Sequence, residues 1–79
     1  MTPAILREGP YRFYFYSHER GERPHIHVVR DDRTAKFWIQ PVALAFNSGF
    51  GRFEVRRLEA IVREHQVEFL EVWYEFFRT

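Results

Sequence analysis

RPHIHVVRDDRTAKFWIQ, residues 23–40, predicts a β-hairpin that decides the fold. Both arms are rich in β-branched and aromatic residues, which is typical of strands. An Asp-Asp dipeptide separates them, so we expect a turn between a strand over residues 25–30 and another over residues 34–39. Pro41 then ends the regular strand or forces a bulge at a sheet edge.

The residues before this hairpin add two further strands. Residues 5–8 predict a short strand closed by a Gly-Pro turn, and the β-prone residues 11–16 follow it. A polar loop, SHERGERP, then leads to the hairpin. Residues 42–51 end in turn-forming Asn and Gly residues and are expected to form a connection. The predicted sheet region therefore covers residues 1–46.

From Arg52 onward, the apolar residues recur with a helical period. One helix over residues 52–78 would be roughly 39 Å long, so we expect a break near His65, whose own role is predicted to be structural. The predicted fold class is α+β, in a single domain of residues 1–79. It has a mostly antiparallel sheet of four or five strands, with one or two C-terminal helices packed on one face.

Side chains alternate across a strand, so each strand presents two faces. One set is uniformly apolar, and the helices should cover it. Together with helical residues it forms the predicted core: Phe13, Phe15, Ile26, Val28, Phe37, Leu58, Val62, Phe69 and Trp73. The other set is expected to face water: Arg12, Tyr14, Tyr16, His25, His27, Lys36 and Trp38.

The cross-strand register follows from pairing the apolar residues antiparallel. The pairs expected on the polar face are Tyr16–His25, Tyr14–His27, His27–Lys36 and His25–Trp38. This register depends on a two-residue turn in the hairpin. A one-residue bulge at Arg33 would instead turn the last strand over and move its polar side chains to the core.

Composition excludes several classes of protein. The 79 residues contain no cysteine, so no disulfide, thiolate or sulfur-ligated metal is expected. No segment approaches the roughly 20 apolar residues of a membrane span, and the N-terminus lacks a secretory signal, so we expect a cytoplasmic protein. Aromatic residues make up 19% of the chain, which is more than so small a core easily buries. They predict a contact surface or a stacking platform.

His25 and His27 are candidate catalytic residues. Residues i and i+2 on one strand face lie roughly 6.5 Å apart, which suits two groups that flank a phosphate. Imidazole populates both protonation states near neutral pH, so metal-free RNA cleavage could use the two rings as acid and base and Lys36 as the cation. The predicted substrate-binding residues are Arg12, Tyr14, Tyr16 and Trp38.

Two other interpretations of the histidine pair stay open. The pair is either a metal site or a polar, water-facing surface without a special role. A zinc site needs at least one further protein ligand. The candidates His18, Glu22, Asp31 and Asp32 have no diagnostic spacing. We therefore predict no cofactor, and metal binding that is absent or adventitious.

The segments TPAILREGPYRFYFYS, RPHIHV, AKFWIQPVALA and EFLEVWYEFF resemble the bacterial family catalogued as domain of unknown function 4160. The resemblance covers nearly the whole chain, and PHIHV followed by AKFW is its most specific part. The chain departs from the pattern at Gly51, where the family usually has a serine, and at residues 74–77. The family pattern picks out Pro24, His25, Ile26, His27, Val28, Lys36, Phe37, Trp38 and Trp73.

The resemblance also implies a partner. Genes of this uncharacterised family often lie beside those of domain of unknown function 2442, in an arrangement that resembles a toxin–antitoxin pair. The leading hypothesis is a toxin-like protein that cleaves or binds RNA without a metal. The alternative is a non-enzymatic module that docks a small partner protein through its aromatic face. Self-association, as a homodimer, is also expected because a small domain gains stability from association.

Overall fold

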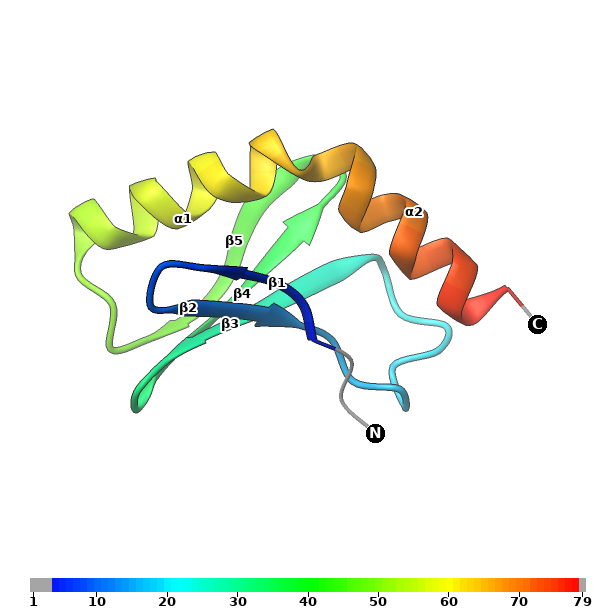
Figure 1. The fold of residues 1–79 in the computed structure, drawn as a ribbon, viewed down its shortest axis with the longest axis horizontal. Coiled ribbons are helices and arrows are strands. Elements are labelled where there is room, and N and C mark those ends of the chain that lie inside the picture. Colours follow the sequence, from blue (N-terminus) through cyan, green and yellow to red (C-terminus); the bar gives the residue numbers. More distant parts are fainter. Residues whose placement is uncertain (1–3, 79) are drawn as a thin grey trace.

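A five-stranded antiparallel sheet with two helices on one face makes up the computed structural model, which describes residues 4–78 (Figure 1). Each strand lies next to its neighbour in sequence, so the sheet is a simple meander. The α+β prediction is confirmed. The elements are β1 (Ala4–Glu8), β2 (Tyr11–Tyr14), β3 (His25–Arg30), β4 (Arg33–Ile39), β5 (Val42–Ser48), α1 (Arg52–Glu64) and α2 (Gln66–Phe77).

The hairpin of β3 and β4 has the predicted register. A two-residue turn joins the strands, with Asp31 at φ 54°, a backbone conformation that short polar residues tolerate. Arg33 pairs directly with Arg30, without a bulge. The confirmed pairs on the polar face are Tyr14–His27, His27–Lys36 and His25–Trp38. β2 ends at Tyr14, earlier than predicted, so Tyr16 lies beyond the ladder.

The connection predicted over residues 42–51 is wrong, because residues 42–48 form β5. Pro41 lies in the turn between β4 and β5, so the regular strand ends before it as predicted, and the sheet continues with β5. β5 is an edge strand with little burial, and Leu44 and Phe46 are 42% and 56% exposed. Its pairing with β4 also contains an irregularity, so the two-residue alternation that identifies a half-buried strand is lost.

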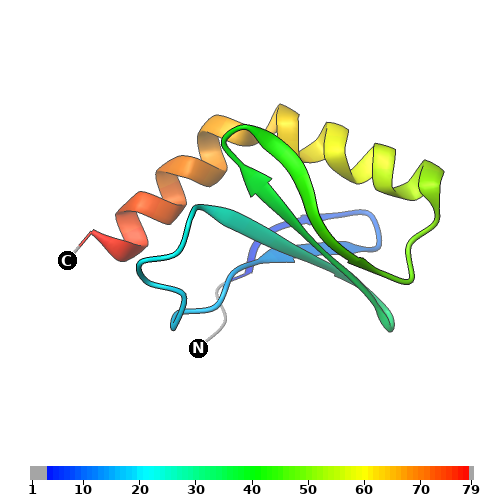
Figure 2. The same ribbon diagram turned by 180° about the vertical axis from the view of Figure 1, so that it is seen from behind.

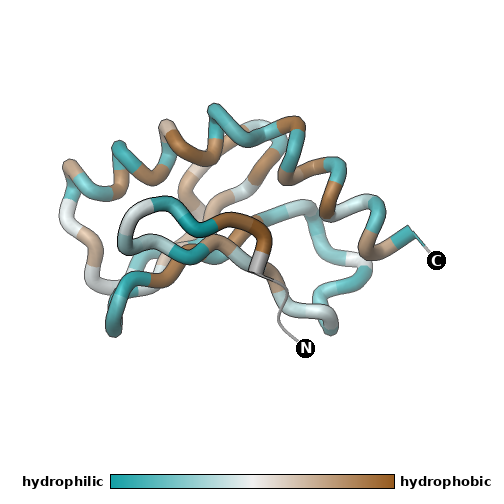
Figure 3. Tube along the Cα trace, in the orientation of Figure 1, coloured by the Kyte–Doolittle hydropathy of each residue, from teal (hydrophilic) through white to brown (hydrophobic). Residues whose placement is uncertain are grey.

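Both helices pack on the apolar face of the sheet (Figure 1), and hydrophobic residues recur along each of them (Figure 3). α1 contributes Leu58 and Val62 to the core, and α2 contributes Phe69 and Trp73. Burying a large apolar side chain contributes roughly 1.5–3 kcal/mol. All nine predicted core residues are buried, and the structure adds Tyr11, Ala35, Ile39, Phe50 and Ile61.

The predicted helix break is confirmed at His65, which has φ −103° and ψ 16° between α1 and α2. At the start of α1, Gly51 makes no side-chain capping bond, consistent with the missing serine hydroxyl. Neither helix in residues 4–78 combines the length and hydrophobicity needed to cross a membrane.

His65 lies among three glutamates at the helix junction. Its Nδ1 is 2.8 Å from Glu68 Oε1, and its Nε2 is 3.3 Å from Glu64 Oε1 and 3.5 Å from Glu8 Oε1. The hydrogen bond to Glu68, helped by the charges of Glu68 and Glu64, raises the pKa of His65 above its ordinary value. The ring therefore joins β1 to the ends of both helices, and these contacts favour its protonated form.

This raised pKa predicts a pH-dependent stability. The contribution of His65 is fully present below the unfolded-state pKa of about 6.5 and is lost as pH rises through the higher folded-state value. Wild type should therefore lose more stability than His65→Gln between pH 5.5 and pH 8, measured as the free energy of unfolding in urea. Salt at 1 M should shrink the difference, because the glutamates are partly exposed. Identical pH profiles for the two proteins would contradict this role.

Candidate functional site

The loop between β2 and β3 carries Glu19 onto the sheet face opposite the helices. Two consecutive turns shape the loop: the Glu19 N–H donates to the Tyr16 carbonyl and the Glu22 N–H donates to the Glu19 carbonyl, each at 3.2 Å. The Tyr16 N–H in turn donates to Glu19 Oε1 at 2.7 Å. These bonds fix a carboxylate that is only 6% exposed.

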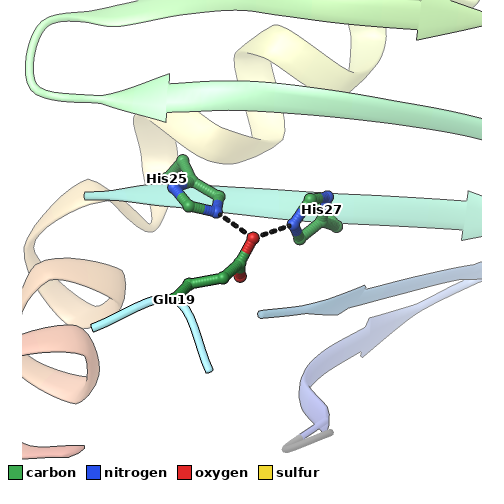
Figure 4. A group of neighbouring side chains, drawn as sticks. All are labelled: Glu19, His25 and His27. Carbon is green, nitrogen blue, oxygen red and sulfur yellow. Dashed lines mark hydrogen bonds and ion pairs between the residues drawn. The ribbon is translucent and has the colours of Figure 1, made fainter. Parts of the chain in front are cut away.

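Glu19 lies between the two histidines of β3 (Figure 4). Its Oε2 is 2.8 Å from His25 Nε2 and 3.0 Å from His27 Nε2. Because His25 and His27 alternate with the core residue Ile26, both rings lie on the polar face of the sheet. One oxygen atom of a loop residue is therefore shared by two imidazoles.

The orientation of His25 is set by its backbone neighbour. Its Nδ1 lies 2.8 Å from the carbonyl oxygen of Arg23, which can only accept, so Nδ1 carries a proton and donates it. The ring contacts Trp38 of β4 and Trp73 of α2 and is 0% exposed. Its Nε2, although near Glu19, lies outside hydrogen-bonding geometry and has no hydrogen-bond partner among residues 4–78. A buried polar atom is thus left without a hydrogen bond.

Burial and hydrogen bonding set the charges of the other two groups. Burial raises the pKa of Glu19, but hydrogen bonds from His27 and from the Tyr16 N–H outweigh it, so this pKa lies below its ordinary value. Burial lowers the pKa of His27 more than the Glu19 carboxylate raises it. At neutral pH, Glu19 is therefore ionised and His27 is neutral and donates from Nε2.

Aromatic rings pack around His27. The ring of Tyr14 stacks on it at 5.3 Å between centroids, and the ring of Tyr16 meets it edge-on at 5.0 Å. Burial raises the pKa of Tyr14 to about 12, so its hydroxyl stays protonated. His18 stacks on the far side of Tyr16, also at 5.3 Å. Arg12 lies over the ring of Tyr14, with its Cζ 5.6 Å from the centroid.

Two cations lie close to the ring of Trp38. Lys36 Nζ is 4.8 Å from the Trp38 ring and Arg23 Cζ is 4.6 Å from it, both within the range of cation–π attraction. Lys36 also lies 3.9 Å from a carboxylate oxygen of Glu22. The indole and its two cations therefore form a half-exposed unit beside the histidines.

The expectation that the polar face is open to water holds in part. Arg12 is exposed, and four further predicted site residues are half-buried: Tyr16, His27, Lys36 and Trp38. The expectation is wrong for Tyr14, which is 7% exposed, and for His25. The β2–β3 loop and the ring of Trp73 cover His25. The alternation of residues along a strand cannot predict such covering by other parts of the chain.

Sequence reasoning missed Glu19 and Arg23, which lie in the loop. Of the proposed third ligands, His18 stacks on Tyr16 and Glu22 reaches Lys36. Asp31 and Asp32 belong to the turn at the other end of β3. A candidate third ligand that the sequence did not indicate does accompany the histidines, because the ligand atoms of Glu19, His25 and His27 lie within 4.8 Å of one another. A loop residue has no periodicity that would have revealed this.

The fold and site define an α+β protein with a Glu-His-His cluster beside an aromatic sheet face. Residues 11–74 match the family described as Domain of unknown function (DUF4160), so the chain belongs to this family. No curated protein and no solved structure matches the chain. The matched residues include the whole cluster, Lys36 and Trp38.

Proposed function

We propose that the sheet face opposite the helices binds single-stranded RNA. Trp38 carries the proposal, because its half-exposed indole lies on this face within cation–π distance of Lys36 and Arg23. Proteins that recognise single strands stack bases on aromatic side chains and neutralise the backbone with nearby cations. The helices run along the other side of the sheet (Figure 2), and from them the ring of Trp73 contacts His25 on this face.

The distribution of charge also favours this face of the sheet as the one that binds RNA. The cations beside the aromatic rings are Arg12, Arg23 and Lys36. Four glutamates instead lie in the C-terminal part of the chain. Three phosphate contacts on a single strand predict a slope of about −2 when log affinity is plotted against log salt concentration. These glutamates belong to the helical region, which packs on the other side of the sheet: Glu64, Glu68, Glu71 and Glu75.

Binding fits this face better than cleavage by His25 and His27. An acid–base pair must reach both sides of the scissile phosphate, and His25 is 0% exposed. His27, whose side chain is 18% exposed, and Lys36 are the members that RNA can reach. Our proposal is a cytoplasmic, toxin-like protein that acts on RNA first of all by binding it.

Replacing Trp38 with alanine is expected to weaken binding of a labelled single-stranded RNA roughly 10-fold or more, because base stacking contributes about 1–3 kcal/mol per base. Fluorescence anisotropy at 50 mM salt measures the affinity. Phe53→Ala is the matched control, since this aromatic side chain is 79% exposed but lies on α1. Trp38→Phe should retain most of the affinity.

Two results would contradict the RNA proposal. The first is an absence of binding by wild type to single-stranded RNA at low salt. The second is an equal loss of affinity in Trp38→Ala and Phe53→Ala, which would place the contact elsewhere. Circular dichroism of each variant shows whether the fold is retained.

A protein partner is the second candidate, and edge strand β5 favours it. Leu44 and Phe46 are exposed on this strand, and Phe46 pairs with Lys36. An unpaired strand edge with apolar side chains is a template for pairing with another chain. The partner is either a second copy or the small protein implied by the neighbouring gene. Failure of wild type to bind RNA would leave this candidate standing.

A further inference from the structure

We propose that Glu19, His25 and His27 bind a divalent transition-metal ion. This inference goes beyond RNA binding and does not depend on it. Two imidazole nitrogens and one carboxylate oxygen are a donor set that suits zinc or ferrous iron. All three donor atoms converge within 4.8 Å (Figure 4).

The distances between donor atoms fit a shared ion. Metal bonds of about 2.1 Å place neighbouring ligand atoms about 3.0 Å apart at right angles and about 3.4 Å apart at tetrahedral angles. Glu19 Oε2 lies 2.8 Å from one histidine Nε2 and 3.0 Å from the other. Small shifts of the side chains, with the proton of His27 moved from Nε2 to Nδ1, would therefore admit the ion.

The surroundings of the donors resemble those of known metal ligands. A metal-binding histidine usually donates its second ring N–H to a carbonyl or carboxylate, which orients the ring. His25 does this through Nδ1 to the Arg23 carbonyl, which turns its Nε2 toward Glu19. Glu19 is held in the same way by the Tyr16 N–H.

Burial supplies the independent observation. His25 is fully buried, and its Nε2 has no hydrogen-bond partner in the described part of the chain. The Glu19 carboxylate lies 2.8 Å away but outside hydrogen-bonding geometry, so this buried nitrogen is incompletely satisfied. A metal bond to this atom would satisfy it. Because oxygen-preferring ions such as Mg²⁺ and Ca²⁺ rarely use imidazole, the donor set selects against them.

Three protein ligands leave at least one coordination position for water or another ligand, as in catalytic zinc sites. His27 is the most exposed of the three, with its side chain 18% accessible. It lies on the same sheet face as Lys36, its direct cross-strand partner. The open position is therefore expected on the side of His27.

The test uses the full chain, stripped of metal with a chelator and titrated with Zn²⁺ or Co²⁺ against a chromophoric competitor. Wild type should take up one ion per chain, and Zn²⁺ but not Mg²⁺ should raise its thermal unfolding temperature. Glu19→Gln and His27→Ala should each weaken metal binding by at least about 100-fold. Removing a residue that only hydrogen-bonds a ligand weakens binding by about 100-fold at most, so a larger loss identifies a direct ligand. Both variants leave the buried His25 ring in place.

Two control variants separate this site from the other imidazoles. His18→Ala removes an exposed ring from the same loop, and His65→Gln removes the ring near Glu8 and Glu64, where donor atoms also converge. Both should bind Zn²⁺ like wild type. Lack of stoichiometric uptake by wild type would overturn the proposal, as would wild-type affinity in both Glu19→Gln and His27→Ala. No RNA is present, so the result does not bear on RNA binding.

Discussion

Replacing His25 with alanine is expected to lower the free energy of unfolding by about 3 kcal/mol, although histidine on a strand face usually tolerates substitution. The ring is 0% exposed and fills the space between Trp38 and Trp73. Its removal leaves a cavity and takes one of two imidazoles away from the buried Glu19 carboxylate. In a domain of this size the unfolding temperature should fall by roughly 12–24 °C.

Urea denaturation in the presence of a chelator measures this effect without a contribution from bound metal. His18→Ala is the control, because an exposed ring on the neighbouring loop should change stability by no more than about 0.5 kcal/mol. If His25→Ala were as stable as His18→Ala, the buried position of His25 would be wrong. Because His25→Ala is expected to destabilise the whole fold, a loss of function in this variant does not by itself identify a catalytic residue.

Replacing Phe15 with alanine should cost about 3–5 kcal/mol, the usual range for a buried phenylalanine. Phe15 follows β2 and is 0% exposed, and its ring lies 5.0–5.4 Å from those of three α2 residues: Trp73, Phe76 and Phe77. The total stability of 79 residues is about 4–12 kcal/mol at typical values per residue. The variant should therefore lose a large fraction of its stability, and at the lower end of this range it would be close to unfolded at room temperature.

Near-ultraviolet circular dichroism and urea denaturation report on this change, because Trp73 lies against the deleted ring. Phe53→Ala removes the same side chain from an exposed position and should leave the stability nearly unchanged. A mild effect of Phe15→Ala, similar to that of Phe53→Ala, would show that α2 does not dock at this end of the sheet.

Local patterns were sufficient to predict the centre of the sheet. Burial alternates from Ile26 to Val29 in β3 and from Thr34 to Ile39 in β4, so the position of His27 follows directly from that of Ile26 and Val28. The paired aspartates fixed the turn and hence the register. The burial of Leu58 and Trp73 also follows from a local pattern, because apolar residues recur there with a helical period.

The parts that were missed depend on contacts that no local pattern reveals. β5 lies at an edge, so its burial does not alternate. Glu19 becomes part of the site through two turns in a polar loop and through contacts with residues six and eight positions later. Such a carboxylate looks like any solvated loop residue until the chain is folded.

The meander has a consequence for the order in which the protein is completed during synthesis. Every strand pairs with its sequence neighbours, so the sheet of residues 4–48 can form by successive local steps as the chain emerges. Its apolar face, with Phe13 and Phe37, stays uncovered until the helices follow. Trp73, which closes the core over His25 and Phe15, arrives last. The nascent chain is therefore most prone to aggregate after the sheet has formed and before α2 leaves the ribosome.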